Sequence, residues 1–193
     1  VAAHCISSKA VKAAIRCGVQ SIEHAYFLEE ADTDEMVKKG LWMFPTLSVT
    51  EKFMENIINK TNPHKIPYWL AAKMPPAYEC QAQSLQLARK AGVNVGFGCD
   101  FVGDADVCQH GDNGMEFGLL CRRGGYMPME TICMATKFGS KVIMEPDLGT
   151  LEKDKLADIV VAKGNPLDNI DILANKNNIK VVMKDGCLRK QID

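Results

Sequence analysis

The sequence predicts an α/β protein in which parallel strands alternate with helices, followed by a smaller β-rich unit. Short apolar runs alternate with helix-length segments from residue 1 to residue 98, which is the pattern of parallel βα units. Glycines stand where these helices should end. After residue 140 the chain becomes rich in β-branched residues separated by Asn-Pro and Asp-Gly turns, as antiparallel strands require.

Strands and helices alternate regularly over the first 47 residues. Ser7-Ser8 can cap a first helix, and Gly18 ends it. Asp32 or Thr33 can cap the second helix, which Gly40 ends. The expected elements are strands over 1–3, 19–22 and 41–47, and helices over 8–17 and 33–39.

Prolines interrupt the next stretch, 50–76. Because proline lacks the amide donor of a helical hydrogen bond, this stretch is expected to form a loop or short helices, with Trp69 and Met74 as packing residues. Further elements are expected as a helix over 77–91 ended by Gly92, a strand over 93–98, a polar loop over 100–114 and helices over 115–123 and 128–138. We place the division between the α/β unit, 1–143, and the β-rich unit, 144–193.

Composition excludes several classes of protein. The net charge of −1 provides no basic field for nucleic acid or for an anionic membrane. No apolar run approaches the ~20 residues that span a bilayer. The eight cysteines include no CxxC pair, which predicts reduced, mostly buried thiols and a cytoplasmic location. The chain begins inside an apolar run without a methionine, and we expect it to be part of a longer protein.

Three chemically active side chains follow expected strands. His4 and His24 are 20 residues apart, about one βα unit, and Asp100 follows the strand that contains Gly96 and Gly98. These glycines leave room for another group to approach the backbone. The carboxyl ends of neighbouring parallel strands meet at one edge. Two imidazoles and a carboxylate there suit a divalent transition metal such as zinc, and the carboxylate can also move a proton.

Other roles for these residues stay open on spacing alone. A histidine after an apolar strand is more often a structural residue, and an aspartate after a glycine-rich strand is often a turn residue or a helix cap. His110 lies in the polar loop and could contact substrate or only solvent. His64, between prolines, is expected to be structural or exposed.

The order of several motifs resembles the C-terminal half of the amidohydrolase superfamily, and most of all its imidazolonepropionase and Xaa-Pro or Xaa-Arg dipeptidase group. The resemblance covers essentially the whole chain. The matching motifs are Ser21-Ile22-Glu23-His24, Gly98-Cys99-Asp100, His110…Glu116, Gly124…Pro128…Ala135-Thr136, Gly149-Thr150-Leu151, the run 156–161, Asn165-Pro166-Leu167 and the run 181–186.

This resemblance implies strands five to eight of a (β/α)8 barrel and part of a small β-sandwich. His4 matches the metal ligand after the fifth strand and His24 the ligand after the sixth. Asp100 matches the carboxylate after the eighth strand, which is both metal ligand and general base, and His110 matches a histidine of the following loop with a role in substrate binding.

The chain also departs from the family pattern. The His-x-His pair of the first strand is absent, because the histidines are only 4, 24, 64 and 110. The lysine of the fourth strand is expected before residue 1. Asp154 replaces the usual glycine before Lys155. We therefore expect half of a barrel, whose open edges require its missing half or another copy of the chain.

The resemblance implies a hydrolase of amide, peptide or cyclic amide C–N bonds, with one or two zinc-like ions and a metal-activated hydroxide as the nucleophile. The substrate class is a dipeptide or another small molecule. A deaminase on the same scaffold is the alternative within the enzyme class. A non-catalytic relative that serves assembly or binding is the alternative outside it.

Overall fold

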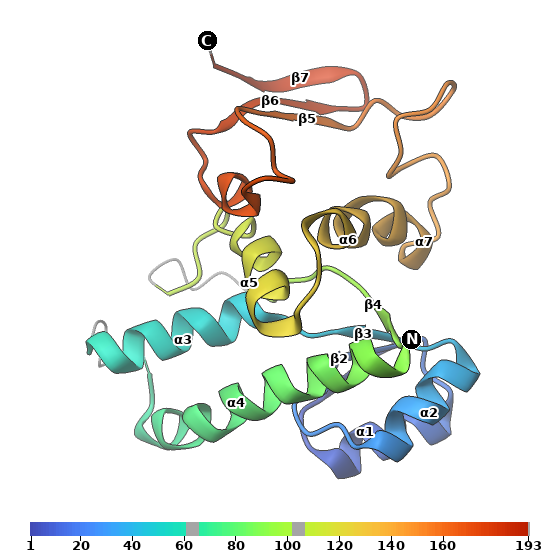
Figure 1. Cartoon of the computed structure of the whole chain (residues 1–193), viewed down its shortest axis with the longest axis vertical. Coiled ribbons are helices and arrows are strands. Elements are labelled where there is room, and N and C mark those ends of the chain that lie inside the picture. Colours follow the sequence, from blue (N-terminus) through green and yellow to red (C-terminus); the bar gives the residue numbers. More distant parts are fainter. Residues whose placement is uncertain (61–65, 102–106, 193) are drawn as a thin grey trace.

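The computed structural model describes residues 1–60, 66–101 and 107–192. Its strands form a four-stranded parallel sheet in the order β1-β2-β3-β4 and a three-stranded antiparallel sheet in the order β5-β6-β7. The antiparallel sheet lies at one end of the molecule, away from α1 and α2 (Figure 1). The predicted α/β class with a parallel sheet is confirmed.

The elements follow one another in the predicted order. The parallel strands are β1 (Ala2–Cys5), β2 (Ser21–His24), β3 (Trp42–Phe44) and β4 (Asn94–Val95). The helices between them are α1 (Ser8–Cys17), α2 (Glu30–Lys39), α3 (Leu47–Asn59) and α4 (Tyr68–Ala91). Next come α5 (Met115–Gly124), α6 (Pro128–Cys133), the π-helical η1 (Met134–Phe138) and α7 (Gly139–Val142). The C-terminal unit contains β5 (Ile159–Ala162), the 3₁₀ helix η2 (Ile170–Ala174), β6 (Ile179–Lys184) and β7 (Cys187–Gln191).

Local capping explains where the first helices begin and end. The Ser7 hydroxyl accepts a hydrogen bond from the amide of Ala10, and Gly18 ends α1 at φ 70°, both as predicted. Helix α2 begins three residues earlier than expected. Glu29 is its N-cap, and the Asp32 carboxylate accepts the amide of Glu29 at 3.1 Å from within the first turn. Asp32 therefore completes a reciprocal cap instead of starting the helix.

The expectation of a loop or short helices over 50–76 is wrong. Helix α3 continues to Asn59, and α4 begins at Tyr68 and contains Pro75 and Pro76. Both prolines are exposed, so the carbonyls that lose their helical donors can hydrogen-bond to water. Met74 packs inside as expected, whereas Trp69 is exposed.

One core lies between the parallel sheet and its helices. Its fully buried members include Val11 of α1, Ile22 of β2, Met36 of α2 and Leu85 of α4. Burial of such a side chain stabilises the fold by about 1.5–3 kcal/mol. Helix α4 contacts α2, α3 and α5 and crosses the strands in Figure 1. Because the sheet is parallel, this core fixes all four carboxyl strand ends at one edge.

The C-terminal unit packs on the segment that follows Asp100. Arg122 of α5 forms a two-oxygen ion pair with Asp171 of η2 at 2.8 Å, and Lys176 pairs with Asp112 at 2.9 Å. A Cβ atom on Gly114 would lie 2.1 Å from the carbonyl oxygen of Leu173, so only glycine fits there. The division at residues 143 and 144 stays a prediction.

None of the eight cysteines is joined to another by a disulfide. Only Cys5 and Cys108 are buried, while Cys17 and Cys187 are exposed, so the expectation of mostly buried thiols is wrong. Most of the others lie in helices, on faces that are not fully turned into the core. None of the helices in the described segments combines the length and hydrophobicity needed to cross a bilayer.

Candidate active site

The carboxyl ends of the parallel strands bring the predicted residues together. His4 lies in β1 opposite Glu23, and His24 is the last residue of β2. Asp100 follows β4 by five residues. The rings of His4 and His24 meet edge to face with centroids 4.5 Å apart. The Nε2 atom of His24 lies 3.9 Å from Oδ2 of Asp100.

These three side chains differ in their access to solvent. His24 is 5% exposed, whereas 40% of the Asp100 side chain is accessible and His4 is exposed. The arrangement therefore consists of one fixed, buried imidazole flanked by two groups that can reach a ligand from solvent.

Backbone strain gathers around the same edge. His24 at the end of β2, Ala25 directly after it, Thr46 after β3 and Asp100 after β4 all have φ between 47° and 76°. A residue other than glycine held in this left-handed region costs about 1–3 kcal/mol, and such residues cluster at functional sites. The surrounding fold therefore forces these three strand ends into defined turns.

His24 is held by a buried hydroxyl. Its Nδ1 lies 2.7 Å from Oγ1 of Thr46. Burial lowers the pKa of His24 and nearby His4 lowers it further, while the Asp100 carboxylate opposes both effects. A neutral imidazole is the form that binds a metal, so burial keeps His24 ready for that role.

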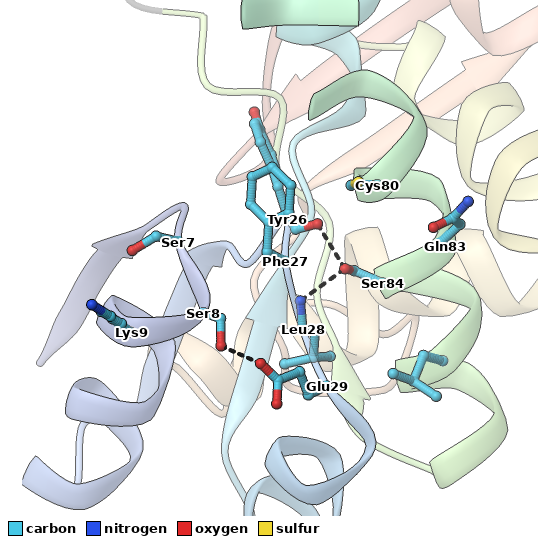
Figure 2. A pocket seen from close by; sticks show the side chains of 11 residues that line it. Ser7, Ser8, Lys9, Tyr26, Phe27, Leu28, Glu29, Cys80, Gln83 and Ser84 are labelled. Carbon is cyan, nitrogen blue, oxygen red and sulfur yellow. Dashed lines mark hydrogen bonds between the residues drawn. The ribbon is translucent and has the colours of Figure 1, made fainter. Parts of the chain in front are cut away.

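Tyr26 forms the wall beside His24. Its ring lies 5.6 Å from the His24 ring, and burial raises the pKa of its phenol. Ser84 of α4 accepts the Leu28 amide at 3.0 Å and donates to the Tyr26 carbonyl at 2.8 Å. Figure 2 shows both bonds, at the wall of a shallow pocket of about 780 Å³ lined by the start of α1, residues 26–29 and α4. Ser84 thereby fixes the loop that carries Tyr26.

Glycines at the end of β4 accommodate Phe44. A Cβ atom on Gly96 would lie 2.2 Å from the Phe44 ring, and one on Gly98 would lie 3.3 Å from it. The group that approaches this backbone is therefore a side chain of β3. Close contact between the two strands sets the direction in which the chain continues to Asp100.

The three predicted donors fit a metal in chemical type. Two imidazoles and one carboxylate are zinc ligands, and His24 directs Nε2 toward Asp100. Within residues 1–60, 66–101 and 107–192, no group of three His, Cys, Asp or Glu side chains is already close enough to hold an ion. His4 and Asp100 are the exposed pair, so they can change rotamer at the least cost.

The two remaining histidines stand apart. His110 is exposed, and in the described part of the chain no hydrogen bond or ring contact joins it to His4, His24 or Asp100. Its role in substrate binding stays a prediction. His64 lies outside the described residues.

Sequence reasoning missed two side chains of this region. Thr46 contacts His24, and the fully buried Glu116 of α5 binds the turn that carries Thr46. Thr46 was missed because the expected strand over 41–47 included it, whereas β3 ends at Phe44 and Thr46 lies in the turn that follows. Glu116 belongs to one of the matching motifs, but the sequence did not indicate its contact, since it reaches the turn from 68 residues away.

Comparison with known proteins decides the family. The model of the amidohydrolase family matches residues 1–188. The chain belongs to the amidohydrolase family.

Similar proteins of known activity support this assignment. Ochratoxinase of Aspergillus niger is 28% identical over 98% of this chain and 38% of its own length. A crystal structure of a Xaa-Pro dipeptidase with methionine bound in its active site matches with a TM-score of 0.86 and 34% identity, over 98% of this chain and 44% of that one. The structure of a prolidase complexed with N-methylphosphonate-L-proline matches with a TM-score of 0.85 and 29% identity, over 100% of this chain and 45% of that one. This amidohydrolase chain therefore spans less than half the length of each of these relatives.

Proposed function

We propose that this chain is the portion of a metal-dependent amidohydrolase that contains strands five to eight of its barrel, and that the complete enzyme hydrolyses an amide or peptide C–N bond. The meeting of His4, His24 and Asp100 at one edge of the parallel sheet carries the proposal. Two of these side chains, His4 and Asp100, are exposed, so packing in a hydrophobic core does not explain why the three lie together.

His4, His24 and Asp100 would hold a divalent metal, and zinc suits their nitrogen and oxygen donors. Such an ion, when bound, supplies a Lewis acid that makes water a stronger acid and polarises a carbonyl. Burial keeps the His24 imidazole neutral, and Thr46 orients it. The remaining ligands of the family pattern are expected outside these 193 residues.

Asp100 would perform the proton transfers. Its accessible carboxylate can accept the proton of the attacking water and then deliver it to the nitrogen that leaves the amide. The carboxylate lies 3.9 Å from Nε2 of His24, although the two residues follow different strands, β4 and β2. Tyr26, whose phenol pKa is raised by burial, packs its ring edge to face against His24.

A dipeptide is the substrate class that we propose. Two of the similar structures are a Xaa-Pro dipeptidase and a prolidase with a proline-containing ligand, and ochratoxinase is a further amidohydrolase relative. A cyclic amide, as in imidazolonepropionases, is the finer alternative. His110 would contact the substrate from the loop after Asp100.

We also propose that the catalytic unit needs either further barrel strands or a second copy of the chain. Among the described strands, β1 and β4 each have only one neighbour in the sheet, and open edges of this kind favour pairing. Eight cysteines without a disulfide among them are consistent with a reducing, cytoplasmic location.

Replacing the proposed proton carrier tests the function. In the complete protein, Asp100→Asn should lower kcat/KM for Xaa-Pro dipeptides by about 10²–10⁴-fold, the usual contribution of a general acid–base group. Folding should be unchanged, because asparagine tolerates the positive φ of this exposed position. The measurement combines initial rates with a thermal melt by circular dichroism.

Asp34→Asn, at an exposed position of α2, is the matched control and should keep full activity. Activity of Asp100→Asn within a few-fold of the wild type would rule out the proposed role.

A further inference from the structure

We infer that Thr46 is a positioning residue that holds His24 in the tautomer protonated on Nδ1, and that a buried network from α4 and α5 locks Thr46 in place. This inference concerns the state of His24, and its importance for catalysis rests on the proposed function.

The hydroxyl of Thr46 has a single proton to share among three partners. Oγ1 donates to the carbonyl oxygen of Pro45 at 2.8 Å, lies 2.7 Å from Nδ1 of His24 and is also hydrogen-bonded to the phenol of Tyr26, which can act as a donor. With its proton given to Pro45, the hydroxyl can only accept from His24. Nδ1 therefore carries the imidazole proton, and the lone pair is left on Nε2, the atom that faces Asp100.

The Thr46 side chain does not cap the helix that it precedes. It is the N-cap of α3, where a threonine hydroxyl usually accepts an amide of the first turn. Here the side chain makes no such bond, and φ is 52°. A β-branched residue is strained in this region, so other groups must hold the turn.

Glu116 caps α3 in place of Thr46. Its Oε1 accepts the Leu47 amide at 3.0 Å, and its Oε2 accepts the Ser48 amide at 2.7 Å and the Ser48 hydroxyl at 2.5 Å. The carboxyl is fully buried. A cap supplied by a different helix leaves the Thr46 hydroxyl free to bind His24.

Gln81 secures the other side of the turn. Its Nε2 donates to the Pro45 carbonyl at 2.7 Å, and its Oε1 accepts from Arg123 at 3.2 Å. Gln81 is fully buried, and removal of one partner from such a network leaves buried polar groups unsatisfied. Side chains of α4 and α5 thus hold the backbone on both sides of Thr46, whose buried hydroxyl contacts His24.

The state of the imidazole can be observed directly. Long-range ¹H–¹⁵N correlation spectra of the complete, metal-free protein at about pH 8, where histidine is neutral, report which ring nitrogen of His24 is protonated. We expect a single Nδ1-protonated form in the wild type and in Thr46→Ser. Thr46→Val, which keeps the shape but loses the hydroxyl, should show a mixture of both tautomers. If it does not fold, Thr46→Ala replaces it.

Thr33→Val is the matched control, because Thr33 is also a buried threonine whose hydroxyl donates to a backbone carbonyl, at 2.7 Å, but it belongs to α2. It should leave the spectrum of His24 unchanged. A wild-type His24 protonated on Nε2, or a Thr46→Val variant that keeps one Nδ1-protonated form, would overturn the inference.

Zinc titration separates this inference from the proposed function. We expect Thr46→Val to weaken zinc binding by about 10–100-fold, the usual effect of losing the partner of a ligating histidine, while Thr46→Ser restores it. If no variant binds zinc but the tautomers follow the pattern above, the inference is supported and the proposed metal-dependent function is wrong.

Discussion

At Glu116, burial and hydrogen bonding shift the pKa of the carboxyl in opposite directions. Complete burial raises its pKa to about 7, although the Ser48 hydroxyl and the Leu47 and Ser48 amides favour the ionised form. Desolvation outweighs three hydrogen bonds because the carboxyl has no access to water. The residue is therefore a titrating group inside the element that supports the candidate site.

A pH dependence of stability follows from this shift. Unfolded glutamate titrates near 4.3, so between that pH and about 7 the folded protein binds more protons at Glu116 than the unfolded chain does. Its stabilising contribution is complete at low pH and is lost as the pH rises through the folded pKa. Relative to Glu116→Gln, the wild type should lose roughly 3 kcal/mol of unfolding free energy between pH 4.5 and 8.

Urea unfolding of both proteins across this pH range provides the measurement, and the difference between them cancels the titration of other groups. A difference that stays constant with pH would show that the Glu116 carboxyl titrates normally in the folded state.

The contact between β3 and β4 is the feature at the scale of elements that sets the position of Asp100. Gly96→Ala should destabilise the protein by about 1–3 kcal/mol, the usual cost of overpacking, because its Cβ would enter the Phe44 ring at 2.2 Å. Gly98→Ala, with 3.3 Å to the same ring, is the matched comparison and should cost less.

Thermal melts of the two alanine variants measure the difference. Equal stability of both variants would mean that the Phe44 ring moves aside without cost, and the close packing of β3 on β4 would then not determine the end of β4.

The helices and strands could be predicted from the sequence where residues within one turn determine their ends. Ser7 and Gly18 bound α1 through bonds within one turn, and both were identified from the sequence. Pro75 and Pro76 led to the wrong prediction that no long helix forms here. Tertiary packing of α4 on three other helices outweighs the two hydrogen bonds that the prolines remove. The candidate site followed the same rule: strand ends indicate His4, His24 and Asp100, whereas the support of Thr46 by Glu116 depends on a contact between distant segments.

At the scale of the whole molecule, the parallel sheet is the unit that the proposed assembly must complete. Several large apolar side chains are exposed, among them Val1, Ile6, Met127 and Ile143, and surfaces of this kind favour association. We expect multi-angle light scattering of residues 1–193 alone to show dimers or larger species. A monodisperse monomer that does not bind a hydrophobic dye would contradict the proposal that this sheet needs further strands.

Anomalous diffraction at the zinc edge, from crystals of the complete protein grown with zinc, tests the central claim most directly. The proposed site predicts a peak with imidazole nitrogens of His4 and His24 at about 2.0–2.1 Å from a zinc ion and a carboxylate oxygen of Asp100 bound to the same or an adjacent ion. Zinc bound elsewhere, or no peak between these three side chains, would contradict the claim.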